Sequence, residues 1–168
     1  MTSATLKKAA LRLHPARWVC GFLDPARLRG NDRLECLLPD GQTETIERGE
    51  LQAVYFVSDF AQLAELTSPP RRGVIPLPGL RVRVRTRGGS WLEGILATEL
   101  LHVHEGVDLT PPHTDSPWQH VFVPSAALLQ LLPVEVVRTP RRRRPTTPDL
   151  GQFPLFQSGS PKPDQEVG

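Results

Sequence analysis

The strongest constraint on the fold is an internal repeat. The segment Trp18-Val19-Cys20-Gly21 corresponds to Trp91-Leu92-Glu93-Gly94, which lies 73 residues later. Further along, four apolar residues recur 77 residues later: Ile46, Leu51, Val54 and Tyr55 correspond to Val123, Leu128, Leu131 and Leu132. The change of offset predicts a four-residue loop insertion in the second unit. Two units are too few to stack as a solenoid, so the repeat predicts two small domains or a fused pair that shares one core.

Alternation of apolar and polar residues predicts strands, most clearly in the second unit. Between Leu80 and Arg87 the apolar side chains face a core and the arginines face outward, because successive side chains of a strand point to opposite faces. Gly88-Gly89 follows as a two-residue hairpin turn that needs positive φ. The other predicted strands of this unit are residues 91–97, 100–104 continued by 107–109, 119–123 and 128–137, the last with Pro133 at a sheet edge or a bulge.

The first unit follows the same plan, although its first hairpin has His14-Pro15-Ala16-Arg17 in place of a glycine turn. Its predicted strands are residues 11–13, 18–23, 34–38, 43–46 and 51–57, and a short helical turn is expected within 58–67. Five short antiparallel strands in each unit predict a small SH3-like or Sm-like barrel, whose closure removes exposed strand edges.

The composition of the C-terminal tail, residues 138–168, differs from that of the preceding 137 residues. Pro makes up 18 of 168 residues, about twice the usual share, which argues against a helical bundle. Residues 138–168 contain six of these prolines and six basic against three acidic residues, whereas residues 1–137 contain 14 basic and 15 acidic residues. The tail is therefore predicted to be disordered, because it cannot bury enough surface to offset its ordering entropy.

The predicted architecture is all-β, with two tandem five-stranded SH3/Sm-like barrels and a disordered C-terminal tail. The boundaries are residues 7–60 for the first barrel, 61–78 for a linker, 79–137 for the second barrel and 138–168 for the tail.

A resemblance to a known family supports this fold. The segment 51–60, which runs from Leu51 to Phe60, resembles the pattern L-K-A-V-F-F-V-x-D-F of an uncharacterised bacterial family whose second half repeats the first. The resemblance covers about residues 9–137, but the family's upstream D-G hairpin is replaced here at residues 14–17. It implies the repeated fold and assigns no activity.

Two basic segments are candidates for nucleic-acid binding. Arg81, Arg83, Arg85 and Arg87 form a ridge of about 20 Å on one face of a strand, which could follow a phosphate backbone. Arg141, Arg142, Arg143 and Arg144 give the tail a salt-sensitive attraction to nucleic acid or to an acidic protein. The alternatives are a solvated strand face paired with acids such as Glu93, and a solubilising tail.

The tail also contains an apolar island, Gln152-Phe153-Pro154-Leu155-Phe156. It resembles the peptide by which bacterial replication and repair proteins bind the DNA sliding clamp. The resemblance implies that Gln152 hydrogen-bonds at the mouth of a clamp pocket, that Leu155 and Phe156 fill it, and that Phe153 takes the position usually held by Leu. An island that folds back on the barrels or binds another partner is the alternative.

Catalytic and metal sites have weaker signals. His102 and His104 would share one face of a strand and, with Glu105, Asp108, His113 and His120, form the one segment rich in metal-ligand types, but no zinc motif accompanies them. Cys20 and Cys36 are either a redox pair or small buried hydrophobes. No triad or phosphate-binding loop is recognisable, so we expect no enzyme and no cofactor. The paired-arginine and D-x-S-x-x-G motifs of PilZ cyclic-dinucleotide receptors are not found either.

Segments for membrane insertion or export are not recognisable: no apolar run reaches about 18 residues, and Lys7-Lys8 is not followed by an apolar stretch. We therefore expect a cytoplasmic protein. The favoured hypothesis is a non-enzymatic bacterial adaptor that binds macromolecules through barrel surfaces and the tail peptide. The alternatives are a nucleic-acid-associated protein that docks on the clamp and a metal-binding protein that uses His102 and His104.

Overall fold

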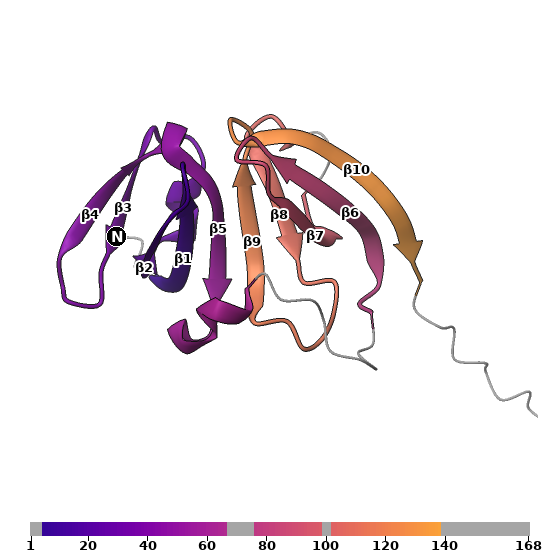
Figure 1. Ribbon diagram of the computed structural model, residues 1–168, viewed down its shortest axis with the longest axis horizontal. Helices are drawn as coiled ribbons and strands as arrows, with labels where there is room; N and C mark the ends of the chain where they lie inside the picture. Colours follow the sequence, from indigo (N-terminus) through magenta and orange to yellow (C-terminus); the bar gives the residue numbers. More distant parts are fainter. Residues whose placement is uncertain (1–4, 67–75, 99–101, 139–168) are drawn as a thin grey trace, which may run out of the picture.

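The computed structural model describes residues 5–66, 76–98 and 102–138, and these residues form an all-β fold with no α-helix (Figure 1). Three short 3₁₀ helices interrupt the strands: η1 (Pro25–Leu28), η2 (Arg48–Glu50) and η3 (Phe60–Glu65). The strands are β1 (Lys7–Leu13), β2 (Arg17–Leu23), β3 (Arg33–Leu37), β4 (Thr43–Glu47), β5 (Leu51–Val57), β6 (Gly79–Thr86), β7 (Trp91–Leu96), β8 (Gly106–Thr110), β9 (Trp118–Pro124) and β10 (Leu128–Val137). Among the described residues, no helix is long and apolar enough to cross a membrane.

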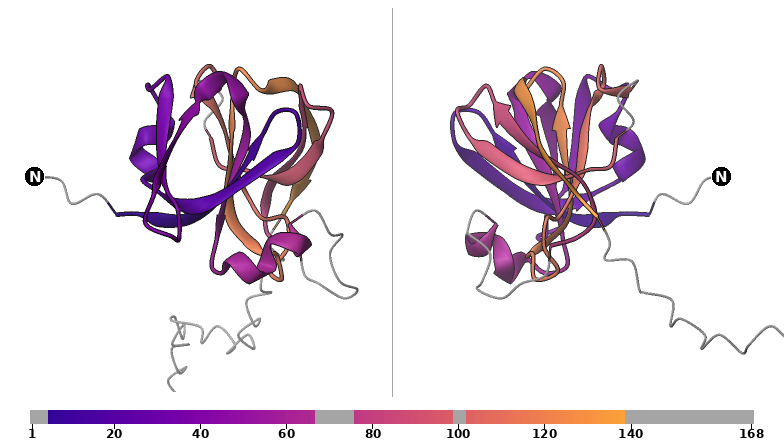
Figure 2. Two further views of the ribbon diagram at one scale, coloured as in Figure 1. Left: turned by 60° about the vertical axis from the view of Figure 1, so that its left-hand side comes forward. Right: turned by 90° about the vertical axis from the view of Figure 1, so that its right-hand side faces the viewer.

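All ten strands belong to one antiparallel sheet, in the order β10-β6-β7-β8-β9-β5-β1-β2-β3-β4. The first half of the chain supplies β5-β1-β2-β3-β4, and the second half supplies β10-β6-β7-β8-β9. In each half, therefore, the fifth strand lies beside the first. The strands of both halves curve strongly (Figure 2).

Strand pairing in the two halves has the same register. Leu11 pairs with Val54 in the first half, and Val84 pairs with Leu131 in the second, in agreement with the sequence offsets of 73 and 77. Other equivalent pairs are Arg12–Trp18 and Arg85–Trp91, Phe22–Leu37 and Ile95–Thr110, and Leu34–Ile46 and Val107–Val123. The offset changes between β8 and β9, so the four additional residues lie in the loop that joins these strands.

Two local expectations need correction. Residues 102–105 form a turn, closed by a hydrogen bond from the Glu105 amide to the His102 carbonyl, so His102 and His104 do not lie on a strand. The β6–β7 hairpin spans residues 87–90, and of its two glycines Gly89 alone has positive φ, at 82°. The amide of Gly88 instead donates a 2.9 Å hydrogen bond to the buried side chain of Gln52 in the first half.

The two halves meet where β5 pairs with β9. These strands lie side by side in the middle of Figure 1, with Val54 opposite Phe122 and Tyr55 opposite Val121. The sequence left open whether the two units are separate domains or a fused pair that shares one core, and this pairing joins both halves into a single sheet. The sheet ends at β10 on one side and at β4 on the other.

Each hydrophobic core contains residues of both halves. The first core consists of first-half side chains together with Phe122 of β9. The second core combines second-half side chains with Ala10, Ala53 and Tyr55 of the first half. Full burial of a side chain the size of Phe122 contributes about 1.5–3 kcal/mol to folding, so residues exchanged across the junction are a substantial part of the stability.

Candidate functional site

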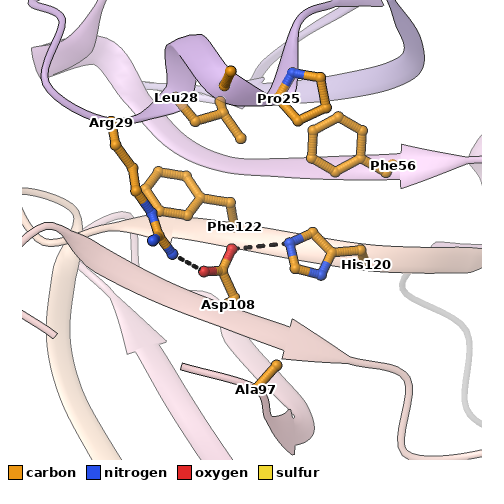
Figure 3. A pocket seen from close by; sticks show the side chains of 9 residues that line it. Pro25, Leu28, Arg29, Phe56, Ala97, Asp108, His120 and Phe122 are labelled. Carbon is orange, nitrogen blue, oxygen red and sulfur yellow. Dashed lines mark hydrogen bonds and ion pairs between the residues drawn. The ribbon is translucent and has the colours of Figure 1, made fainter. Parts of the chain in front are cut away.

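A pocket of about 400 Å³ opens at the junction of the two halves (Figure 3). One side comes from the segment that contains η1 and from β5, and the other side comes from β8, β9 and the residue after β7. Its lining residues are Pro25, Ala26, Leu28, Arg29, Phe56, Ala97, Asp108, His120 and Phe122. Neither half alone could form this site.

The 3₁₀ helix η1 positions the first-half wall. Asp24 caps its start by accepting a 3.0 Å hydrogen bond from the amide of Ala26, and Pro25 suits the first turn because it lacks an amide proton. Leu28 is buried in the first core and anchors the end of η1. Arg29 consequently begins at the rim of the pocket and reaches across to the second half.

Asp108 of β8 is the polar centre of the pocket. Its carboxylate accepts hydrogen bonds from His120 Nε2 at 2.9 Å and from the Thr98 hydroxyl at 3.2 Å, and it forms an ion pair with Arg29. Burial alone would raise the pKa of Asp108, but the hydrogen bond and charge of His120, with Arg29 and Thr98, hold it below its usual value. Asp108 is therefore ionised at neutral pH.

The Asp108 carboxylate determines the tautomer of His120. An ionised carboxylate has no proton to donate, so the proton of their hydrogen bond belongs to His120 Nε2. In the neutral ring, Nδ1 then carries a lone pair and accepts hydrogen bonds. The described residues offer Nδ1 no hydrogen-bond partner, and the side chain is 34% exposed. The ring lies 5.7 Å from that of Phe56 and packs against it.

Arg29 joins the two halves by charge and by packing. Besides its ion pair with Asp108, its Nε lies 3.8 Å from a carboxylate oxygen of Glu105 and its guanidinium lies 6.0 Å from the centre of the Phe122 ring. Arg48 supports the same region by donating to the carbonyl of Leu28 at 2.7 Å and to that of Glu105 at 3.0 Å. Because the charges of Arg29 and Asp108 cancel, the pocket combines apolar walls with a near-neutral polar edge.

A family model matches residues 5–134 of the chain, and it describes a family of unknown function, DUF6982. The chain belongs to the DUF6982 family. No curated protein and no solved structure matches the chain.

The DUF6982 match spans both halves and therefore includes the whole pocket. It agrees with the sequence resemblance to a family without an assigned activity. The match ends before the basic tail, so the tail lies outside the region that identifies the family.

The arginine ridge is shorter than expected and is partly neutralised. Arg81, Arg83 and Arg85 lie on β6, whereas Arg87 lies in the hairpin that follows it. Arg81 forms ion pairs with Glu93 and Glu135, and Arg83 Nε lies 3.3 Å from Glu93. The guanidinium of Arg85 lies 5.7 Å from the centre of the Trp91 ring, and Trp91 is 48% exposed. Nucleic-acid binding by Arg81, Arg83, Arg85 and Arg87 stays a prediction, which the exposed indole favours and the ion pairs weaken.

The described residues hold no group of three or more metal-ligating side chains. His102 and His104 lie in the turn before β8, with ring centres 6.4 Å apart, while Asp108 and His120 pair with each other in the pocket. Metal binding through His102 and His104 stays a prediction.

Cys20 and Cys36 are both free thiols. Cys36 is buried in the first core, whereas Cys20 packs against the second. Burial raises the pKa of Cys36 to about 11 and also raises that of Cys20, so neither is activated as a thiolate. This environment favours the interpretation of small buried hydrophobes.

The tail predictions concern residues 139–168, which lie outside the described part of the chain. They include the basic run Arg141, Arg142, Arg143 and Arg144 and the peptide residues Gln152, Phe153, Leu155 and Phe156.

Sequence reasoning missed most of the pocket. Asp108 and His120 were noted as metal-ligand types, but their mutual hydrogen bond was not foreseen, and Arg29 was not singled out. One signal was available: Asp108 lies between two apolar residues in Val107-Asp108-Leu109, at the position equivalent to the exposed Glu35 of the first half. The repeat thus places Asp108 on an outer face, but it does not indicate that the other half covers this face.

Proposed function

We propose that this DUF6982 protein is a non-enzymatic binding module that holds a protein partner at the pocket between its two halves. In this proposal each half is an SH3- or Sm-like barrel unit, and the two units are fused through β5 and β9. The observation that carries the proposal is a pocket to which both halves contribute walls, with apolar surface next to an oriented histidine. Sites with few polar groups on apolar walls are typical of binding pockets.

The chemistry of the pocket favours binding over covalent catalysis. Its nine lining residues include no Ser, Thr, Cys or Lys, and the two lining residues of nucleophilic type, Asp108 and His120, are hydrogen-bonded to each other. The carboxylate of Asp108 is engaged by three donors, which supports a role in holding His120 and Arg29 in place.

A capture experiment tests the proposal. Wild-type protein and the His120→Ala variant are used to retain proteins from a lysate, and the His104→Ala variant serves as a matched control because His104 does not line the pocket. We expect one protein to be retained by the wild type and the control and lost with His120→Ala, and to bind directly once purified. If no retained protein depends on His120, the pocket is not the binding site and the proposal is wrong.

The tail provides a second proposed contact, which rests on the sequence resemblance. The triple variant Gln152→Ala/Leu155→Ala/Phe156→Ala should lose the DNA sliding clamp from the same capture while keeping any His120-dependent partner. Equal clamp retention by both proteins, or none by either, would refute this contact.

Nucleic-acid binding is the second candidate function, and the exposed Trp91 beside Arg85 favours it. A base could stack on the indole while neighbouring arginines contact phosphates. We expect binding to single-stranded nucleic acid to weaken steeply with salt and to fall in Trp91→Ala and in Arg83→Glu/Arg85→Glu. Binding that is unchanged in both variants would exclude the ridge.

A further inference from the structure

We propose that the pocket accepts a neutral aromatic side chain that carries one hydrogen-bond donor, a phenol or an indole, presented by a partner polypeptide. This inference rests on the proposed function and specifies its ligand. It follows from four properties of the pocket: its walls, its charges, the tautomer of His120 and the exposure of the site to solvent.

The walls require an apolar, preferably planar ligand. Pro25, Leu28, Phe56 and Phe122 line the space in Figure 3 from both halves, and Pro25 is the most accessible of them because Leu28, Phe56 and Phe122 are also packed in the first core. Aromatic rings stack with one another in offset or tilted geometry, and the ring of His120 already packs in this way on Phe56. A planar ligand ring can stack in the same way on the exposed part of the His120 ring, because that side chain is 34% exposed.

The charges require a neutral ligand. Arg29 and Asp108 compensate each other within the pocket, and Glu105 offsets part of the remaining field of Arg29 from the rim. A carboxylate ligand would be repelled by Asp108 and Glu105, whereas an ammonium ligand would compete with Arg29 for an acceptor that three donors already occupy. The pocket therefore complements neither a negatively charged nor a positively charged ligand.

The tautomer requires a ligand that donates a hydrogen bond. Because His120 Nε2 donates to Asp108, Nδ1 of the neutral ring is the acceptor that the pocket leaves without a partner among the described residues. A phenol O–H or an indole N–H supplies one donor on a planar apolar body, so it satisfies the walls and the acceptor together.

The exposure of the pocket favours a side chain on a polypeptide over a free small molecule. His120 and Arg29 are 34% and 41% exposed, so the site covers a ligand on one side only. A free molecule should bind measurably but weakly through such partial contact, whereas a polypeptide adds contacts around the anchoring ring and binds more tightly.

The test measures the binding of p-cresol and toluene to the full chain by NMR shifts of the His120 ring and of pocket side chains. These probes have nearly the same shape, but only p-cresol has a donor. We expect p-cresol to bind about 3- to 10-fold more tightly, the effect of one net hydrogen bond. Equal affinities, or no binding of either probe at the pocket, would overturn the inference.

Two variants isolate the role of His120. His120→Phe keeps a ring against Phe56 and removes the acceptor, so toluene should still bind and the preference for p-cresol should disappear. Asp108→Asn should reduce the same preference and change the ¹⁵N shifts of the His120 ring, because the Asn amide can donate to Nε2 and move the proton to Nδ1. Unchanged ring shifts and an unchanged preference in Asp108→Asn would refute the tautomer argument even if His120→Phe failed to fold.

A final comparison identifies the source of the ring. A capped, uncharged peptide Gly-Ser-Tyr-Ser-Gly should displace p-cresol, and its Phe counterpart should displace it less well. Binding of p-cresol without displacement by the Tyr peptide would overturn assignment to a polypeptide. Loss of all probe binding together with His120-dependent capture of a protein would leave the proposed function standing and this ligand assignment wrong.

Discussion

At the scale of single residues, Tyr55 has a polar side chain that the junction of the two halves buries completely. It is fully buried between Trp18 and Trp118, with ring centres 5.6 and 6.3 Å away, and its hydroxyl has no hydrogen-bond partner among the described residues. Burial raises the pKa of Tyr55 to about 12 against the opposing effect of the Arg12 guanidinium, which lies near the hydroxyl but outside hydrogen-bonding geometry. The ring stabilises the junction, whereas the hydroxyl carries a desolvation cost.

We therefore expect Tyr55→Phe to leave stability unchanged or to raise it by up to about 1 kcal/mol. Urea unfolding of both proteins at neutral pH measures the difference. A loss above about 1 kcal/mol would mean that the hydroxyl makes a stabilising interaction after all.

Gly106 is required where β8 begins. Its φ is +149°, and a Cβ there would lie 2.6 Å from a ring carbon of Phe122. We expect Gly106→Ala to cost about 2–5 kcal/mol, because it adds backbone strain and overpacks a pocket wall. Gly49→Ala is the matched control, since a Cβ on Gly49 meets no atom within 4 Å, and it should change stability little. Equal effects of both variants in thermal unfolding would refute this account.

The Asp108 carboxylate should make stability depend on pH. Its pKa is lowered in the folded protein, so its stabilising contribution is fully present above the unfolded value of about 3.9 and is lost as pH falls through the folded pKa. Asp108→Asn lacks this contribution. The stability difference between wild type and variant should therefore be largest at pH 5–7 and shrink towards pH 2.5. A difference that stays constant over this range would show that Asp108 is not stabilised as a carboxylate.

At the scale of elements, differences between the two halves disfavour a further strand pairing at the β10 edge. By register, β10 is equivalent to β5 and β4 to β9, so a second copy could in principle pair its β4 with β10 as β9 pairs with β5. The face that such a pair would bury differs between the halves. Ala10, Cys20 and Ala53 of the first half are replaced by Arg83, Glu93 and Gln130 in the second.

Proline adds to this protection of the edge. Pro133 on β10 occupies the position of Phe56 on β5, and it cannot donate a hydrogen bond to a further strand. The prediction from sequence that Pro133 lies at an edge or a bulge is confirmed, since β10 ends the sheet and its register shifts between Pro133 and Glu135.

We expect the variant Arg83→Ala/Glu93→Ala/Gln130→Ala to associate in a concentration-dependent way, because it replaces two charged side chains and one polar side chain by a surface like that of the first half. Light scattering after size exclusion measures the mass. Adding Thr45→Pro, which blocks pairing through β4, should restore the mass of the wild type. Association of the wild type itself through these strands would contradict the argument.

At the scale of the whole molecule, shared cores make the two halves one folding unit. Ala10 and Tyr55 are completely buried in the second core, and Phe122 is buried in the first. Separation of the halves would expose all three residues to water. The unfolding of one half therefore removes part of the other core.

We expect a single unfolding transition. Variants that retain either Trp18 or Trp91 as the one fluorescent indole report on the first and the second half, respectively. Both should give the same midpoint in urea, and the calorimetric and van't Hoff enthalpies should agree. Separate midpoints would show that the halves unfold independently.

The sequence alone determined the positions of the strands and the equivalence of the two halves, because alternation, hairpin turns and the repeated W-x-x-G segment are local signals. It failed locally at residues 102–104, where apolar and polar residues alternate as in a strand but residues 102–105 form a turn. Only the tertiary structure decided that β5 pairs with β9, and hence that Arg29, Asp108 and His120 meet in one pocket. The physical reason is that no local pattern specifies which edges of two equivalent units pair, because that choice depends on which exposed faces are apolar enough to be buried together.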